Sequence, residues 1–254
     1  MDVIKAVVLV GTAGMFVSAL APPKRAKEGR GGKAAIYKGQ LFEFVVRSLA
    51  YVACALVVAS ALGYSALLLY RAEVLGSPLI PRLCPSKPPS LDPLASYSPR
   101  FIAGVALALA GAGMRLSTYR ALGSLFTYEV VVKDDHRLVT SGPYRYVRHP
   151  SYTGMALLFI GTHLIHLADG ASYVTYCDLG DTPATLAIQF WKISAPFAVL
   201  SVFRRCPVED AQLRERFGAE WERYRKDVPY ALVPYDYVTA YAGFVDPASR
   251  GSGT

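Results

Sequence analysis

Residues 48–70 read SLAYVACALVVASALGYSALLLY, a run made mostly of Ala, Leu and Val that contains no charged side chain. Because a helix rises 1.5 Å per residue, about 20 such residues cross the hydrocarbon core of a bilayer. A helix also satisfies its own backbone hydrogen bonds, which the membrane interior requires. The stretch therefore predicts a transmembrane helix.

The composition of the whole chain supports this assignment. Of its 254 residues 53% are apolar and 18% are charged, with a mean hydropathy of +0.29. Soluble domains carry about 25% charged residues, so the composition argues against a disordered chain and against an ordinary cytosolic enzyme. We expect an all-α polytopic membrane protein with about five transmembrane helices. The expected spans are 3–21, 44–70, 101–118, 152–167 and 183–203.

Two of these segments have unusual residues. The third contains Gly104, Gly111 and Gly113, and small residues let helix backbones approach closely in lipid. The fifth contains Lys192, a costly charge in mid-span, and Pro196, which removes a backbone donor. The fifth segment is therefore either one span or a bent re-entrant hairpin.

The distribution of positive charge predicts the orientation. With five spans, the segments 22–40, 119–151 and 204–254 share one side and contain 19 lysines and arginines, whereas the loops 71–100 and 168–182 contain 4. Positively charged loops stay in the cytosol, so the segments 22–40, 119–151 and 204–254 should be cytosolic. We expect the first segment to be kept as a span rather than cleaved as a signal peptide, because its charged leader is poor and Pro22 directly follows the cleavage-like Ala-Leu-Ala.

The net charge of +8 and the four cysteines limit the kinds of partner and metal site that we expect. In a membrane protein this charge points to lipid headgroups and orientation, and we expect no nucleic-acid partner. The cysteines form no CxxC pattern, so no metal site is expected. Cys84 and Cys177 fall in the two non-cytosolic loops, where a disulfide between them and two unpaired thiols are equally compatible with the sequence.

Polar residues concentrate in two cytosolic segments. The first, 115–152, is dense in Arg, His and Tyr, and taken alone it fits an interfacial belt. The second, 204–235, should form a helix over about 207–227. Pro207 suits its first turn, and Leu213, Phe217 and Trp221 begin an apolar stripe along it. Such a helix lies on the membrane or closes over the first segment, and Gly218 within it marks a close approach to a ligand or another helix.

At these two segments the chain resembles the isoprenylcysteine carboxyl methyltransferases, a family of membrane methyltransferases related to the phospholipid methyltransferases. The first block is His136-Arg137-Leu138-Val139, Gly142-Pro143-Tyr144, Arg148-His149-Pro150-Ser151-Tyr152 and Gly154. The second block is Arg205, Glu209-Asp210, Phe217-Gly218, Trp221, Tyr224, Val228-Pro229 and Val233-Pro234-Tyr235. The resemblance covers roughly 115–235. Where the family carries a longer acidic run, this chain has Pro207, which could separate Arg205 from the helix that bears Glu209.

The resemblance implies an enzyme that transfers a methyl group from S-adenosylmethionine to the C-terminal α-carboxylate of prenylated proteins. It implies a farnesyl- or geranylgeranyl-cysteine substrate, a multi-pass protein of the endoplasmic reticulum membrane and a cytosolic active site. By similarity Arg205 is the catalytic and substrate-binding residue. The implied cofactor-binding residues are His136, Arg137, Leu138, Val139, Tyr144, His149, Pro150, Ser151, Tyr152 and Glu209.

The chemistry makes these roles reasonable. A guanidinium binds a carboxylate bidentately and keeps its charge in a partly dry site, which suits Arg205. Glu209 can hydrogen-bond the cofactor, although a simple i,i+4 salt bridge with Arg205 is the alternative. Two other functions stay open: methylation of a phospholipid amine headgroup, which Arg205 disfavours, and a non-catalytic scaffold. We divide the chain into membrane spans (1–114), a catalytic core (115–235) with the cofactor pocket, and a tail (236–254).

Overall fold

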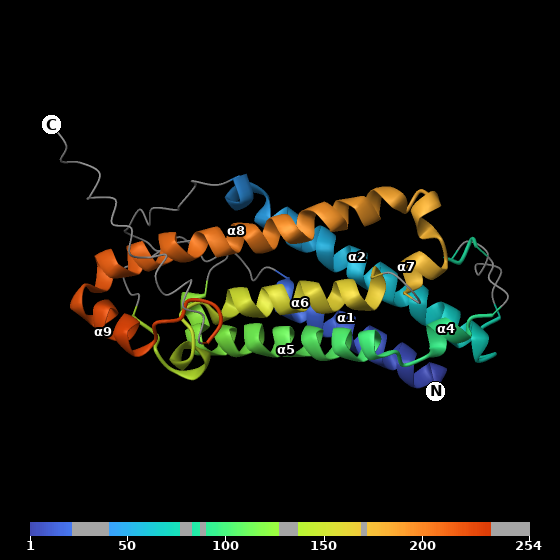
Figure 1. Ribbon diagram of the computed structural model, residues 1–254, viewed down its shortest axis with the longest axis horizontal. Helices are drawn as coiled ribbons and strands as arrows, with labels where there is room; N and C mark the ends of the chain where they lie inside the picture. Colours follow the sequence, from blue (N-terminus) through green and yellow to red (C-terminus); the bar gives the residue numbers. More distant parts are fainter. Residues whose placement is uncertain (22–40, 77–82, 87–89, 127–136, 169–171, 235–254) are drawn as a thin grey trace.

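The computed structural model describes residues 1–21, 41–76, 83–86, 90–126, 137–168 and 172–234. Its long helices are α1 (Asp2–Leu20), α2 (Leu41–Arg71), α5 (Pro99–Leu122), α6 (Pro150–His166) and α8 (Thr185–Phe217), and α9 (Ala219–Asp227) follows α8. Shorter elements are α4 (Asp92–Ala95), α7 (Tyr173–Tyr176) and the 3-10 turns Gly123–Leu125, Gly142–Arg145 and Leu179–Asp181. The described residues contain no strand. The long helices run along one axis as a bundle, with α9 at one end and α4 and α7 at the other (Figure 1).

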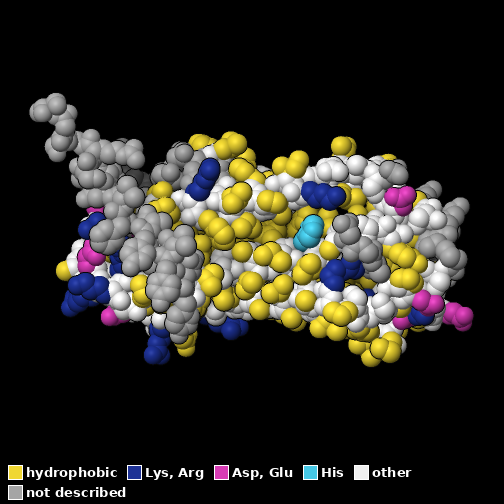
Figure 2. Space-filling view, viewed as in Figure 1, with side chains coloured by type: hydrophobic (Ala, Val, Ile, Leu, Met, Phe, Trp, Pro, Cys, Tyr) yellow, Lys and Arg dark blue, Asp and Glu magenta, His cyan; other side chains and the backbone are white. Residues whose placement is uncertain are grey.

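Four of the described helices are long and apolar enough to cross a membrane: α1, α2 from Phe44, α5 and α8. Apolar side chains dominate the middle of the face seen in Figure 2. The membrane character predicted from the sequence is therefore confirmed. The expected fourth span is α6, a helix of 17 residues, which is shorter than the about 20 residues of an ordinary span. The count of five spans stays a prediction.

Glycines bring α5 and α6 into backbone contact. A Cβ built on Gly111 would lie 2.5 Å from the carbonyl oxygen of Gly154 and 2.5 Å from the amide nitrogen of Leu158. A Cβ on Gly104 would lie 3.0 Å from the carbonyl oxygen of Gly161. The close approach expected of the third span is thus confirmed for Gly104 and Gly111. Gly113 has open space around it and takes no part.

The end of the bundle that holds α4 and α7 is fixed by polar and covalent contacts. The Lys5 ammonium is buried and donates to the carbonyl oxygens of Leu94 and Ser96, each at 2.6 Å. A disulfide joins Cys84 to Cys177, closing a separation of 93 residues. Of the two alternatives left open by the sequence, the structure contains the disulfide.

The C-terminal helix differs from the sequence expectation. α8 runs without interruption from Thr185 to Phe217 through Pro196 and Pro207, so 183–203 is neither a hairpin nor separated from the acidic pair. The expected helix over 207–227 is wrong: its first half is the end of α8, and a new helix, α9, begins at Ala219. Gly218 divides the two with a φ of +51°, a conformation that favours glycine. No atom lies within 4 Å of a Cβ built on Gly218, so this glycine allows the turn between α8 and α9 and does not mark a close approach of another helix.

Candidate active site

Two segments distant in the sequence meet at the α9 end of the bundle. The amide of Arg148 donates to the carbonyl oxygen of Tyr230 at 2.9 Å, and the amide of His149 donates to that of Ala231 at 2.8 Å. The hydroxyl of Thr153 donates to the carbonyl oxygen of Leu232. We call residues 228–232 the C-terminal strap. It lies against the start of α6, so the two motif blocks share one end of the molecule.

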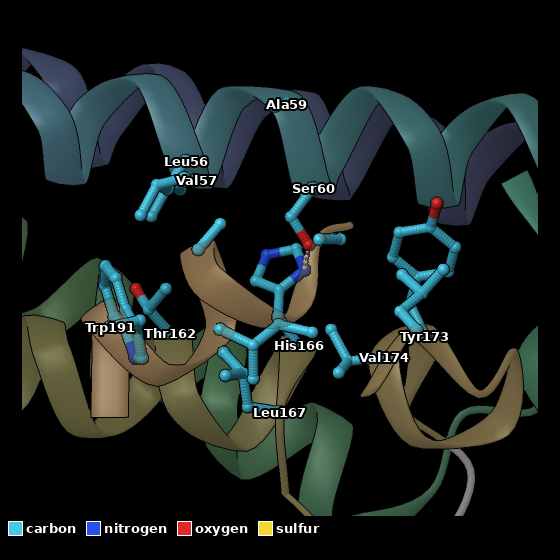
Figure 3. Close-up of a pocket in the computed structure, with 14 residues that line it drawn as sticks. Leu56, Val57, Ala59, Ser60, Thr162, His166, Leu167, Tyr173, Val174 and Trp191 are labelled. Carbon is cyan, nitrogen blue, oxygen red and sulfur yellow. Dashed lines mark hydrogen bonds between the residues drawn. The ribbon is translucent and has the colours of Figure 1, made fainter. Parts of the chain in front are cut away.

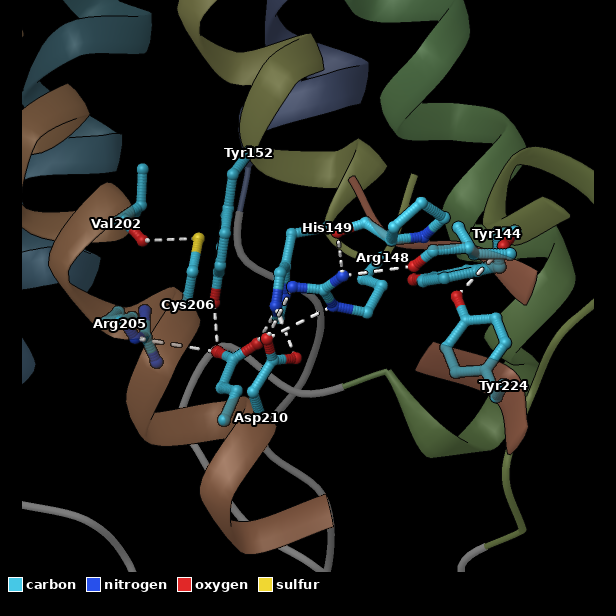
Figure 4. Close-up of polar contacts among 12 residues, drawn as sticks. Tyr144, Arg148, His149, Tyr152, Val202, Arg205, Cys206, Asp210 and Tyr224 are labelled. Carbon is cyan, nitrogen blue, oxygen red and sulfur yellow. Dashed lines mark hydrogen bonds and ion pairs between the residues drawn. The ribbon is translucent and has the colours of Figure 1, made fainter. Parts of the chain in front are cut away.

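Asp210 and Arg148 connect α8 to the strap. One carboxylate oxygen of Asp210 accepts from Nε and Nη2 of Arg148, at 3.2 and 3.1 Å (Figure 4). Nη1 of the same guanidinium donates to the carbonyl oxygens of Val228, at 3.0 Å, and Pro229. The Arg148 side chain is only 5% exposed. A single buried arginine therefore ties α8, the start of α6 and the strap together.

Glu209 lies at the centre of the remaining polar contacts. Its carboxylate accepts from the Tyr152 hydroxyl, lies 3.3 Å from Nδ1 of His149, and lies 3.9 Å from Nε of Arg205 one turn earlier on α8. The rings of His149 and Tyr152 stack with centroids 5.7 Å apart. Arg205 is 5% exposed and Glu209 24% exposed. The structure thus brings His149, Tyr152, Arg205 and Glu209 into one cluster, in which the carboxylate is more accessible than the imidazole and the guanidinium.

His149 is charged at neutral pH in this cluster. Burial by itself lowers the pKa of the imidazole, but the carboxylates of Asp210, 3.0 Å from Nε2, and Glu209 outweigh burial and raise it to about 9. The site therefore has two carboxylates facing the cations of Arg148, His149 and Arg205. Such a balanced array keeps both carboxylates ionised and oriented.

Two tyrosines form the outer wall of the site. The Tyr224 hydroxyl of α9 donates to the carbonyl oxygen of Tyr144 at 2.9 Å, which fixes the turn Gly142–Arg145 against α9. Burial raises the pKa of both phenols above the usual value, so both stay neutral. Tyr144 is half-buried and lies on the far side of Arg148 from His149 and Tyr152 (Figure 4).

The other expected site residues have different surroundings. His136 lies outside the described residues, while Arg137 is exposed and Leu138 and Val139 are half-buried in an irregular stretch. Pro150 is buried at the first turn of α6. The backbone oxygen and the hydroxyl of Ser151 each accept from Nη1 of Arg115 at 3.2 Å, so this side chain faces α5 rather than Glu209.

Sequence reasoning gave no site role to four residues that shape the site: Arg115, Arg148, Asp210 and Tyr224. Arg115 of α5 is 4% exposed, and its Nε donates to the carbonyl oxygen of Ala19 at 2.8 Å, so it joins α1, α5 and α6. An arginine within an expected membrane span was the available signal for it. Asp210 was noted as part of a motif but given no role. Arg148 and His149 are adjacent in the sequence, which could have indicated that one acidic residue forms ion pairs with both.

Comparisons with known proteins show which sequences this chain is similar to. Residues 104–179 match the model of the isoprenylcysteine carboxyl methyltransferase (ICMT) family. A protein-S-isoprenylcysteine O-methyltransferase of Schizosaccharomyces pombe is 34% identical over 126 residues, which cover 48% of this chain and 44% of that protein. The human protein-S-isoprenylcysteine O-methyltransferase is 31% identical over 134 residues, or 52% and 40% of the two chains. The chain spans about half the length of the curated relatives it matches. The resemblance predicted from the two motif blocks is confirmed.

Proposed function

We propose that this chain, as a relative of the isoprenylcysteine carboxyl methyltransferases, methylates the C-terminal α-carboxylate of prenylated proteins with S-adenosylmethionine as the donor. The observation that carries the proposal is the convergence of Arg205, Glu209, His149 and Tyr152 at one end of the bundle. The membrane helices and the similar proteins support the same assignment.

The residues at this end fit the proposed cofactor. When bound, S-adenosylmethionine supplies an electrophilic methyl group on a sulfonium cation. Glu209 is partly exposed, and a carboxylate has about four acceptor positions, of which the contacts with Tyr152 and His149 use two. Nε of Arg205, at 3.9 Å, lies beyond hydrogen-bonding distance. A cationic, amine-bearing ligand can therefore take an acceptor position that is left. The half-buried ring of Tyr144 would exclude water on one side, whereas Ser151 is engaged by Arg115 and is a weaker candidate.

The chain's own residues then orient the substrate carboxylate and transfer no proton. A substrate carboxylate is ionised at neutral pH and needs no general base. Arg205 would hold one edge of this carboxylate, and Glu209 on the same helix face keeps the guanidinium from binding the nucleophile too strongly. Orientation and exclusion of water can supply about 7–11 kcal/mol of such a barrier. The imidazolium of His149 keeps Glu209 ionised and in place.

The membrane setting suits a prenylated substrate. We propose that the site faces the cytosol at the endoplasmic reticulum, since two described stretches rich in Lys and Arg, 137–151 and 204–234, meet there. The prenyl chain would lie among the helices while its carboxylate meets Arg205 at the interface. Methylation removes a charge that faces anionic headgroups and strengthens anchoring of the product. The division into 1–114, 115–235 and 236–254 stays a prediction.

A labelled-methyl assay on a farnesylcysteine analogue tests the proposal. Transfer should give a base-labile methyl ester, and Arg205→Ala should lower kcat/KM by at least about tenfold, the value of one charge-assisted hydrogen bond. Arg204→Ala is the matched control, because Arg204 is the adjacent residue on α8 but is exposed. Base-stable products on phosphatidylethanolamine would instead indicate an N-methyltransferase. If neither methyl transfer nor cofactor binding by calorimetry is observed, the hypothesis that remains is a non-catalytic scaffold.

A further inference from the structure

A cavity lies away from the candidate active site, in the half of the bundle nearer the disulfide. It has a volume of about 220 Å³ and is lined by α2, α6, α7 and the start of α8. Its walls include Val57, Ile188 and Trp191, and the exposed residue Ala59 of α2 also lines it (Figure 3). Because α2 and α8 are membrane-spanning candidates, we expect this cavity to be accessible from the bilayer.

Among the polar atoms of this cavity, Nε2 of His166 has no hydrogen-bond partner within the described residues. The Thr162 hydroxyl donates to the carbonyl oxygen of Leu158 at 2.8 Å, and the Tyr173 hydroxyl donates to that of Leu83 at 3.1 Å. Nδ1 of His166 lies 3.0 Å from the Ser60 hydroxyl, which leaves its Nε2 facing the cavity. His166 is 3% exposed. This nitrogen therefore lines the open space of the cavity, where the hydrogen-bonding group of a ligand can reach it.

Aromatic side chains separate this cavity from the candidate active site. The ring centroids of Phe159 and Trp191 lie 5.4 Å apart, and Phe16 packs on both, at 5.8 and 6.1 Å. Trp191 and Arg205 are 14 residues apart on α8, which is about 21 Å along the helix axis. The occupant therefore enters from the surrounding lipid rather than from the methyl-transfer site.

We propose that this cavity binds the hydroxyl end of an uncharged lipid alcohol from the bilayer. No lysine, arginine, aspartate or glutamate lines it, so a charged headgroup would lack a counter-ion. The hydrogen bond between His166 and Ser60 allows either tautomer, and Nε2 is a donor in one and an acceptor in the other. A hydroxyl group pairs with both, whereas a carbonyl pairs with only one. The apolar walls receive the hydrocarbon part.

Photolabelling of the full chain in phosphatidylcholine nanodiscs tests this proposal. The probe is a straight-chain fatty alcohol that carries a diazirine, and the competitors are unlabelled dodecanol and dodecane. Dodecanol should compete about fivefold better than dodecane, the ratio that corresponds to one net hydrogen bond of about 1 kcal/mol. His166→Leu keeps the cavity apolar and should make the two competitors equal. Equal competition in the unchanged chain would overturn the proposal without any substitution.

A cavity-filling pair of variants locates the site. Ala187→Phe places a ring into the cavity and should abolish labelling of the α6 and α8 peptides. Leu186→Phe, at a neighbouring position that is 81% exposed, should leave labelling unchanged. Labelling that persists in Ala187→Phe, or a preference for dodecanol that persists in His166→Leu, would each contradict the assignment. The readout is lipid binding, so it stands apart from methyl-transfer activity.

Discussion

Replacement of Gly111 and Gly113 by alanine should shift stability in opposite directions. The two residues lie on α5, but only Gly111 faces α6. A Cβ at Gly111 would lie 2.5 Å from two backbone atoms of α6, whereas ordinary contacts begin at 3.4 Å. Backbone atoms cannot rotate away, so the helices must separate by about 1 Å, and such overpacking costs about 1–3 kcal/mol. At Gly113 the same change meets nothing and gains up to about 1 kcal/mol of helix propensity.

Thermal unfolding in one detergent, followed by tryptophan fluorescence, measures the difference. Trp191 and Trp221 are both buried, so their emission reports loss of packing. We expect the midpoint of Gly111→Ala to fall by about 4–8 °C, which corresponds to about 2 kcal/mol for a chain of this size, and that of Gly113→Ala to stay or rise.

The same pair of variants should also separate in activity. Gly154, whose oxygen lies closest to the added Cβ, is two residues beyond Tyr152, so a displaced α6 moves the start of the site. Methyl transfer should therefore fall in Gly111→Ala and persist in Gly113→Ala. Equal midpoints and equal activities in the two variants would refute the inferred contact between α5 and α6.

Three further predictions concern charge and redox state. The ion pairs of His149 stabilise the fold by up to about 3 kcal/mol below pH 6.5, the ordinary pKa of histidine, and this contribution is lost as the pH rises through about 9. In His149→Gln the free energy of unfolding should therefore depend less on pH over this range. Asp210→Asn removes the carboxylate that pairs with a buried arginine and should destabilise by about 3 kcal/mol in denaturation assays, whereas Glu215→Gln, exposed on the same helix, should change stability by less than about 0.5 kcal/mol. In sealed microsomes in which the disulfide has been reduced, an impermeant maleimide should label Cys84 only once the membrane is opened. Labelling of Cys84 in intact microsomes would contradict the proposed orientation.

Periodicity and motif order predicted much of this molecule. The apolar runs located α1, α2, α5 and α6 to within a few residues, because hydrocarbon requires a continuous helix of a set length. The expected fifth span, 183–203, matches only the first part of α8, which continues to Phe217. The two polar blocks indicated which segments would meet, and the structure places them at one end. The pairing of Cys84 with Cys177 stayed open, since spacing alone does not distinguish a disulfide from free thiols.

Tertiary packing decided what the sequence could not. Pro207 predicted a helix start, yet α8 continues through it even though a proline inside a helix costs about 3 kcal/mol. Cys206, one residue earlier, packs with Ala231 and Leu232 of the C-terminal strap, so this part of α8 is in tertiary contact. The strap itself has no periodic signal. Its carbonyl oxygens are recognised by Arg148, a long-range contact that local patterns cannot reveal.

The length of α8 makes the site sensitive to hydrophobic mismatch. Its 33 residues extend about 50 Å, whereas the hydrocarbon core measures about 30 Å. We therefore expect the final turns, which carry Arg205 and Glu209, to project beyond the acyl chains. Longer acyl chains would draw these turns into the hydrocarbon and strip water from their charges, so we expect the protein to work best in thin bilayers.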